Sequence, residues 1–227
     1  MSIKLAVFDM AGTTVHDENF VADALVRAFA THQLYITRQH ANRKMGIPKP
    51  VAIRELLEEM YEEMPADIDK TVNQIHNDFR AAMLECYRTH PGVRSKEHAE
   101  DVFRELKNIG ITVALDTGFS RDIADAITER LGWSTRKLVD MVITSDEVKQ
   151  GRPAPDMIFR AMELAGVQQA YEVAKIGDTV SDLEEGTSAG CRYVIGITSG
   201  AQPRHELEKA PHTHLVDNLK EVLPILI

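Results

Sequence analysis

The sequence predicts an α/β fold in which a doubly wound parallel sheet carries a small all-helical cap, inserted after the first strand. A short apolar run, Leu5 to Phe8, stops abruptly at Asp9, which is typical of a strand buried on both faces. Residues 15–90 then show apolar side chains at helical spacing and no strand pattern. From Ser95 onward, helical and strand patterns alternate, which indicates βα units on a parallel sheet.

The block after the first strand is expected to contain helices over about residues 20–29, 37–46, 51–63 and 67–88. Asp17 is expected to be the N-cap of the first of these helices. Pro91 and Gly92 form a turn that closes the block. We therefore expect an α/β core of residues 1–14 and 92–227 and a helical cap of residues 15–91.

The remaining helices and strands follow one another in pairs. Helices are expected over residues 97–108, 122–131, 156–165 and 181–189, and strands over 111–116, 141–144, 173–176 and 193–197. His212 and His214 are expected to flank a final edge strand. Because such units build one parallel sheet with right-handed crossovers, the first strand belongs to the same sheet. The cap is therefore expected over the carboxyl end of the first strand.

The composition and net charge limit the kinds of partner that this protein is expected to bind. The formal net charge of −9 argues against nucleic acid or an anionic membrane as the main partner. An anionic substrate would need a local positive site or a metal. Cys86 and Cys191 lie far apart in sequence, which favours a reducing compartment over a disulfide scaffold. No apolar run is long enough to span a membrane, so we expect a cytoplasmic protein with a small-molecule substrate.

Polar residues follow each of the first four predicted strands at the point where the strand ends. They are Asp9, then Thr117 and Gly118, then Thr144 to Asp146 with Arg152 a short way beyond, then Asp178 and Asp182. Because the carboxyl ends of parallel strands share one edge, these side chains are expected to meet in one crevice. Three carboxylates in that crevice suit Mg²⁺, which takes oxygen ligands and a substrate phosphate oxygen.

Such a crevice could transfer a phosphoryl group. A carboxylate can attack phosphorus when a metal and a cation neutralise the oxygens that it approaches. Thr117 and the N–H of Gly118 would bind phosphoryl oxygens at a helix start, where the helix dipole favours anions. Arg152 would hold the nucleophile and the phosphate together as a fixed fork of donors.

These motifs resemble those of the haloacid dehalogenase superfamily, whose core is Rossmann-like. The matching stretches are Asp-Met-Ala-Gly-Thr at 9–13, Thr-Gly at 117–118, Gly-Arg-Pro at 151–153 and Gly-Asp-x-x-x-Asp at 177–182. The resemblance implies that Asp9 forms an aspartyl-phosphate. It also implies that Mg²⁺ is held by Asp9, the Ala11 carbonyl and Asp178, with Asp182 orienting the waters of the metal. A homodimer through the cap is a further implication.

Ala11 points to one branch of that superfamily. Most of its phosphatases carry an Asp at this position as the general acid, and loss of such a donor typically costs roughly 10²–10⁴ in rate. The Ala-Gly-Thr-Thr stretch, together with Arg152, is similar to the phosphonatase (phosphonoacetaldehyde hydrolase) family. The cap motif Met-Gly-x-x-Lys of that family matches residues 45–49. The resemblance implies that Lys49 forms a Schiff base with the substrate aldehyde. Contacts to the substrate are expected from Gly12, Thr13, Met45 and Gly118.

Three positions depart from the phosphonatase pattern. The histidine three residues after the lysine is replaced by Ala52, the cysteine near the start of the cap by Asn19, and the tyrosine after Thr-Gly by Phe119. The phosphorus-binding half of the motif set is therefore intact, whereas the aldehyde-handling half is altered. His16, in the hinge after the first motif, is a candidate replacement acid or base.

Three functions remain open at this point. The first is a Mg²⁺-dependent hydrolase that cleaves the P–C bond of phosphonoacetaldehyde or an analogue through Asp9 and Lys49. The second is a phosphatase acting on a small phosphorylated metabolite or a phosphoanhydride, which would survive loss of Lys49. The third is a non-catalytic binding protein on the same scaffold, against which the intact Asp9, Asp178 and Arg152 argue.

Overall fold

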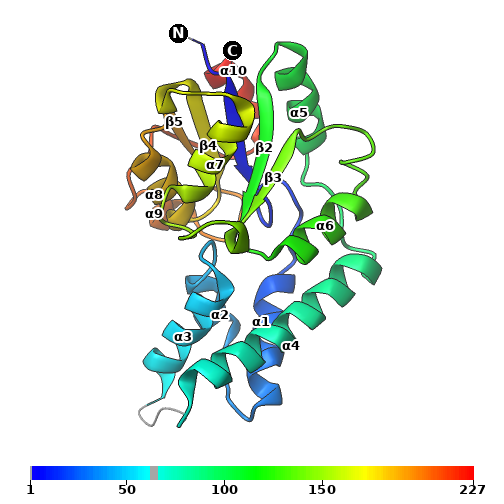
Figure 1. Ribbon diagram of the computed structural model, residues 1–227, viewed down its shortest axis with the longest axis vertical. Coiled ribbons are helices and arrows are strands. Elements are labelled where there is room, and N and C mark those ends of the chain that lie inside the picture. The colour runs from blue at the N-terminus through cyan, green and yellow to red at the C-terminus, as the bar shows by residue number, and fades with distance from the viewer. Residues whose placement is uncertain (1, 62–65) are drawn as a thin grey trace.

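The computed structural model describes residues 2–61 and 66–227, and its centre is a six-stranded sheet (Figure 1). The strands are β1 (Leu5–Asp9), β2 (Thr112–Thr117), β3 (Met141–Thr144), β4 (Val173–Gly177), β5 (Tyr193–Ile197) and β6 (His214–Val216). Their order is β3-β2-β1-β4-β5-β6, and every neighbouring pair is parallel. This confirms the predicted doubly wound α/β fold. The order reverses between β1 and β4, where sheets of this kind bind their ligands.

Both faces of β1 are covered, which explains its unbroken apolar sequence. Phe8 packs edge-on against Phe103 with ring centroids 5.4 Å apart on one face, while Leu5 and Val7 pack against Met157 on the other. The main covering helices are α5 (Ala99–Asn108), α6 (Arg121–Arg130), α7 (Asp156–Ala165) and α8 (Val180–Ala189). Shorter helices α9 (Arg204–Leu207) and α10 (Leu223–Leu226) follow.

Four helices form a separate lobe beyond the carboxyl ends of the strands (Figure 1). They are α1 (Phe20–Thr31), α2 (Arg38–Arg43), α3 (Lys49–Met60) and α4 (Ile68–Thr89). The lobe thus occupies the place predicted for the cap, and we use that name for residues 15–91. The exact division between core and cap at 14/15 and 91/92 stays a prediction.

Two details of the cap differ from the sequence-based expectation. The third helix begins at Lys49 rather than Val51, since Pro50 is tolerated in a first helical turn. That helix ends at Met60, and the residues 62–63 to which the prediction extended lie outside the described residues. The N-cap of α1 is Asn19 in a left-handed conformation, not Asp17, although the Asp17 carboxylate still accepts the Phe20 N–H at 2.6 Å.

Among the described residues, none of the helices combines the length and the apolar character that a membrane crossing requires.

Candidate active site

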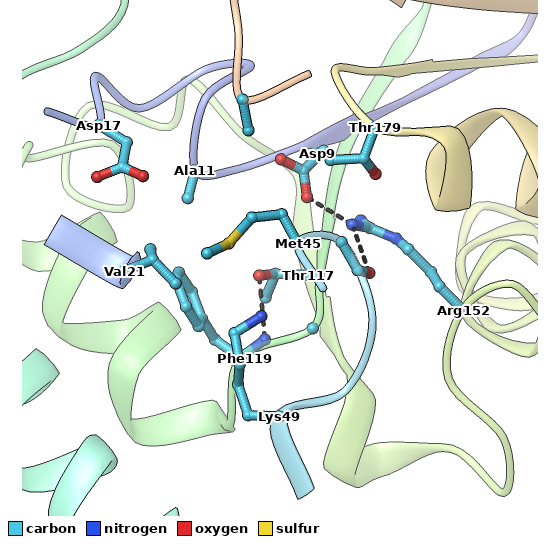
Figure 2. Close-up of a pocket in the computed structure, with 13 residues that line it drawn as sticks. Asp9, Ala11, Asp17, Val21, Met45, Lys49, Thr117, Phe119, Arg152 and Thr179 are labelled. Carbon is cyan, nitrogen blue, oxygen red and sulfur yellow. Dashed lines mark hydrogen bonds and ion pairs between the residues drawn. The ribbon is translucent and has the colours of Figure 1, made fainter. Parts of the chain in front are cut away.

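A cavity lies between the carboxyl ends of β1 and β2 and the cap, and we call it the active-site cavity (Figure 2). About 380 Å³ within it is not filled by protein atoms, a figure that includes space open to solvent. Asp9, Thr117 and Arg152 line it from the core, and Met45 and Lys49 line it from the cap. Residues more than a hundred positions apart in sequence therefore face one small space.

Arg152 lies at the centre of a buried cluster of charges beside this cavity. One terminal nitrogen donates to Asp9 Oδ1 at 2.6 Å and lies 2.9 Å from Asp182 Oδ1. The Nε donates to Glu185 Oε2 at 3.0 Å, and the other terminal nitrogen donates to the side chain and carbonyl of Asp116. Burial alone would lower the pKa of Arg152, but Asp116 and the other carboxylates raise it well above its usual range. The guanidinium is therefore a permanent cation held against Asp9.

Asp116, Lys175 and Glu185 complete the cluster, and none of the three was predicted from the sequence. Lys175 Nζ donates to Asp116 Oδ2 at 2.6 Å and lies 2.7 Å from Glu185 Oε2, so it fills the space among these acids. Two signals were available in the sequence. Lys175 interrupts an otherwise apolar strand, and Glu185 follows Asp182 by one helical turn. A lysine in such a strand has to find carboxylate partners, because burying an unpaired charge is costly.

Asp9, Asp178 and Asp182 bring carboxylate oxygens within 4.8 Å of one another, close enough to share one metal ion. Asp178 is oriented by the Thr13 hydroxyl, 2.8 Å from Oδ1, and by the Ala201 N–H, 2.5 Å from Oδ2. Burial and then repulsion from Asp182 raise the pKa of Asp178 to about 6. Burial also raises the pKa of Asp9 well above its usual value, although Arg152 opposes this. A cation among the three would relieve that repulsion.

The charge balance of the cluster fits a divalent cation. Its carboxyl groups are Asp9, Asp116, Asp178, Asp182 and Glu185, and its two cations are Arg152 and Lys175. Burial raises the pKa of Glu185 to about 8, so this group is protonated at neutral pH. Four carboxyl groups then face two cations, and a metal ion among Asp9, Asp178 and Asp182 would help these groups to ionise together. Asp182 Oδ1 also lies 2.9 Å from Arg152 and 3.2 Å from Lys175. The donors are all hard oxygen ligands.

Thr117 and Gly118 line the cavity at the end of β2, and their binding of phosphoryl oxygens stays a prediction. Thr117 Oγ1 accepts the Phe119 N–H at 3.2 Å, and α6 begins shortly after this loop. Gly12 and Thr13 are placed differently. Within the described part of the chain, neither lines the active-site cavity: the Gly12 carbonyl accepts from Lys96 Nζ at 2.6 Å, and Thr13 supports Asp178. Their contact with a substrate stays a prediction.

Lys49 reaches into the cavity from the start of α3 (Figure 2). The residue is only 3% exposed, its Nζ donates to the Ile47 carbonyl at 3.3 Å, and Nζ lies 5.9 Å from the centroid of the Phe119 ring. Burial, opposed mainly by Asp9, lowers the pKa of Lys49 from its ordinary 10.5 to about 8. Much of this amine is therefore neutral in mildly alkaline solution, as a nucleophilic lysine requires.

The loop before Lys49 packs closely against the core at two glycines. Gly46 has a positive φ of 84°, and a Cβ there would lie 2.2 Å from Thr179 Oγ1 in the core. A Cβ on Gly118 would lie 2.9 Å from the Ile47 carbonyl oxygen in the cap. Only glycine allows these backbones to approach so closely at both places. This close packing places Lys49 in the same cavity as Asp9, Thr117 and Arg152.

His16 does not face the cavity. Its Nε2 lies 2.8 Å from Glu18 Oε1 and 2.8 Å from an Arg94 nitrogen, on the outer side of the hinge. Ala52 is buried in α3, and Phe119 lines the cavity at the position where the phosphonatase pattern has tyrosine. The described residues therefore place no histidine on the wall of this cavity.

Comparisons with known proteins agree with this geometry. The model of the haloacid dehalogenase-like hydrolase family matches residues 3–190. The chain is 30% identical over 213 residues to a phosphonoacetaldehyde hydrolase from Bacillus cereus, covering 88% of this chain and 78% of that protein. It is 29% identical over 213 residues to a bifunctional phosphonoacetaldehyde hydrolase/aminoethylphosphonate transaminase from Clostridioides difficile, covering 88% of this chain but only 32% of that protein.

Solved structures share the fold over nearly the whole chain. A hydrolase from Pseudomonas syringae superposes with a TM-score of 0.86 at 20% identity, covering 98% of this chain and 97% of that one. A phosphonoacetaldehyde hydrolase-like protein from Oleispira antarctica superposes with a TM-score of 0.83 at 18% identity, covering 100% and 92%. The family match and the 30% identical relative show that the chain belongs to the haloacid dehalogenase-like hydrolases, as a phosphonatase-like member.

Proposed function

We propose that this hydrolase is Mg²⁺-dependent and cleaves the P–C bond of a small phosphonate with an aldehyde on the next carbon, phosphonoacetaldehyde or an analogue. The observation that carries the proposal is the burial of Lys49 in the same cavity as Asp9, with a pKa of about 8. A phosphatase needs no nucleophilic amine beside its carboxylate, whereas cleavage of a P–C bond needs an electron sink on the adjacent carbon. The 30% identical relative is named for this activity.

In the proposed reaction Lys49 acts first. Its neutral amine adds to the carbonyl carbon, and loss of water leaves a protonated imine that can accept electrons from the neighbouring bond. Asp9 then attacks phosphorus, the P–C bond breaks, and its electron pair forms an enamine on Lys49. Arg152 holds Asp9 in place and neutralises the phosphoryl oxygens together with Thr117 and Gly118. Mg²⁺ held by Asp9, the Ala11 carbonyl, Asp178 and Asp182 would neutralise further charge on the phosphoryl group.

A phosphatase remains the second candidate because of Ala52. The phosphonatase pattern has a histidine at that position, and a buried alanine cannot exchange a proton with an imine. A phosphate ester or phosphoanhydride would use Asp9, Arg152 and the metal site in the same way. Lys49 would then serve only as a binding cation.

Treatment with sodium borohydride distinguishes the phosphonate-cleaving enzyme from the phosphatase. With phosphonoacetaldehyde present, reduction of the imine should inactivate the enzyme and attach the two-carbon product to Lys49, which peptide mass spectrometry would locate. Lys70, an exposed lysine of the same cap, should stay unmodified. Release of phosphate from acetyl phosphate or sugar phosphates, with no trapping and no reaction of phosphonoacetaldehyde, would contradict the proposal and favour the phosphatase.

The rate at which borohydride traps the imine should increase with pH. Since the neutral amine is the nucleophile and its pKa is about 8, the rate should rise with pH and level off above about 8. An ordinary, solvated lysine would continue to gain reactivity up to about 10.4. A trapping rate that continues to rise steeply up to a pH of about 10 would show that Lys49 is not the reacting amine.

Metal binding should stabilise the fold as well as support activity. Because the folded pKa of Asp178 is raised to about 6, the metal-free protein should lose stability as the pH rises through that value. Added Mg²⁺ should therefore raise Tm more above pH 6 than below it, with a gain of about 2.7 kcal/mol at one hundred times Kd. Asp178→Asn should remove the gain. Asp101→Asn, which changes an exposed carboxylate paired with Arg104, should keep it; equal gains in both variants would contradict the site.

A further inference from the structure

Asp17 is a carboxylate of the active-site cavity to which the proposed reaction has given no role. It lies in the hinge that leads from β1 into the cap, and it lines the same cavity as Asp9 and Lys49. Figure 2 shows its carboxyl group on the side of the cavity where Ala11 lies. Ala11 has no proton-transfer group of its own. Asp17 thus supplies a carboxyl group to the region that Ala11 leaves without one.

The side chain of Asp17 is held in place by the start of α1. Its Oδ1 accepts the Phe20 N–H at 2.6 Å, which fixes the plane of the carboxyl group. Burial raises the pKa of Asp17, and the backbone N–H groups of Phe20 and Val21, His16 and Lys49 only partly offset this effect. A carboxylate whose ionised form is destabilised in this way accepts a proton more readily than a solvated one.

Asp17 also lines a second cavity. This polar space of about 530 Å³ shares Asp17 and Ala201 with the active-site cavity and extends to the exposed residues Asn19 and Ser199. A proton taken up by Asp17 therefore has a route to solvent through this second cavity. Lys96, on the same wall, donates to the carbonyls of Gly12 and Ser199 at 2.6 and 2.7 Å, which leaves it no role as a base.

We propose that Asp17 is the general base for hydrolysis of the aspartyl-phosphate on Asp9. A water oxygen bonds to phosphorus, the bond between phosphorus and Asp9 breaks, and Asp9 regains its carboxylate. The water proton passes to Asp17, and phosphate leaves. Asp17 then releases its proton toward the second cavity. This inference rests on the aspartyl-phosphate of the proposed function, but it holds for a phosphonate and a phosphate substrate alike.

Other groups near the phosphoryl site cannot take this proton as readily. Arg152 is a permanent cation, and His16 points away from the cavity to Glu18 and Arg94. With a phosphonate substrate, Lys49 carries the enamine while the phosphate is attached to Asp9, so its nitrogen is occupied. With a phosphate substrate, its pKa of about 8 leaves most of this amine protonated at neutral pH. Among the described residues that line the cavity, Asp9 and Asp17 are the carboxylates, and Asp9 is itself phosphorylated at this stage.

The experiment follows the phosphorylated enzyme through a single turnover. Wild type, Asp17→Asn and Asp17→Ser are mixed with phosphonoacetaldehyde or acetyl phosphate, quenched in acid and analysed by intact-protein mass spectrometry. Neither leaving group depends on Asp17: Lys49 assists the first, and acetate leaves unaided. Asn and Ser both still accept a hydrogen bond at a helix N-terminus, so α1 should remain capped. Glu18→Gln, an exposed neighbour, is the matched control.

In both Asp17 variants the phosphorylated protein should accumulate, with a burst of first product and a steady-state rate lower by about 10²–10⁴-fold. Glu18→Gln should behave like wild type. A merely structural role would slow both steps or lower Tm, without accumulation of the phosphorylated enzyme. Turnover of the Asp17 variants at the wild-type rate would overturn the inference and leave the proposed function standing. A wild-type enzyme that turns over neither compound and forms no phosphorylated protein would instead overturn the proposed function.

Discussion

Asp9→Asn is expected to abolish hydrolysis of phosphonate and phosphate substrates alike, with a loss of about 10⁴–10⁶-fold, the scale seen when a nucleophile is removed. The amide cannot form the phosphorylated intermediate, and the neighbouring Asp116 and Asp182 cannot take its place because they are held by Lys175 and Arg152. Phosphate release measured with a coupled assay, and the mass of the acid-quenched protein, would both report the loss.

The fold should survive this change. Burial raises the pKa of Asp9, so its ionised form is unfavourable in the metal-free protein, and a neutral amide should not lower Tm there. Asp101→Asn again provides an exposed control that should keep wild-type activity. Substantial phosphate release by a correctly folded Asp9→Asn protein would mean that another residue is the nucleophile.

Lys49→Met is expected to impair cleavage of a P–C bond far more than hydrolysis of a phosphate compound. Cleavage of phosphonoacetaldehyde should fall by about 10⁴-fold or more, as for removal of a covalent catalytic group, since no imine can form. Hydrolysis of acetyl phosphate should change far less, because it needs only Asp9, Arg152 and the metal. Phosphate release from both compounds, measured side by side, gives this selectivity as a ratio.

Methionine keeps the length of the lysine side chain and removes the charge. Because burial lowers the pKa of Lys49, the protonated amine destabilises the fold at neutral pH, and Tm should rise in the variant. Lys70→Met alters an exposed lysine of the same cap and should change neither activity. Equal losses on both substrates would assign Lys49 to phosphoryl binding and would support the phosphatase.

The parallel sheet and many residues at the carboxyl ends of its strands could be predicted, because the sequence patterns that indicate them are local. Apolar runs that end in Asp9, Thr117 and Asp178 mark strands and their carboxyl ends, and parallel topology brings such ends together whatever lies between them in the chain. Lys49 was found in a different way, through the motif of residues 45–49. Its burial and lowered pKa could not be read from that motif, because both depend on how the cap packs on the core.

The tertiary structure was required to recognise the places of Lys175, Glu185 and Asp17 in the site. Lys175 and Glu185 look like isolated charges in a strand and a helix, and their pairing with Asp116 depends on contacts between separate elements. The sequence suggested that Asp17 is the N-cap of the first cap helix, and Asp17 does accept a hydrogen bond from α1. Its place on the wall of the active-site cavity depends on how the cap packs on the core. The sequence by itself determined the parallel sheet, the inserted helices and the residues at the strand ends, since periodicity and motif spacing are local. Only the tertiary structure decided which charges are buried together, because burial and mutual repulsion arise when distant segments meet.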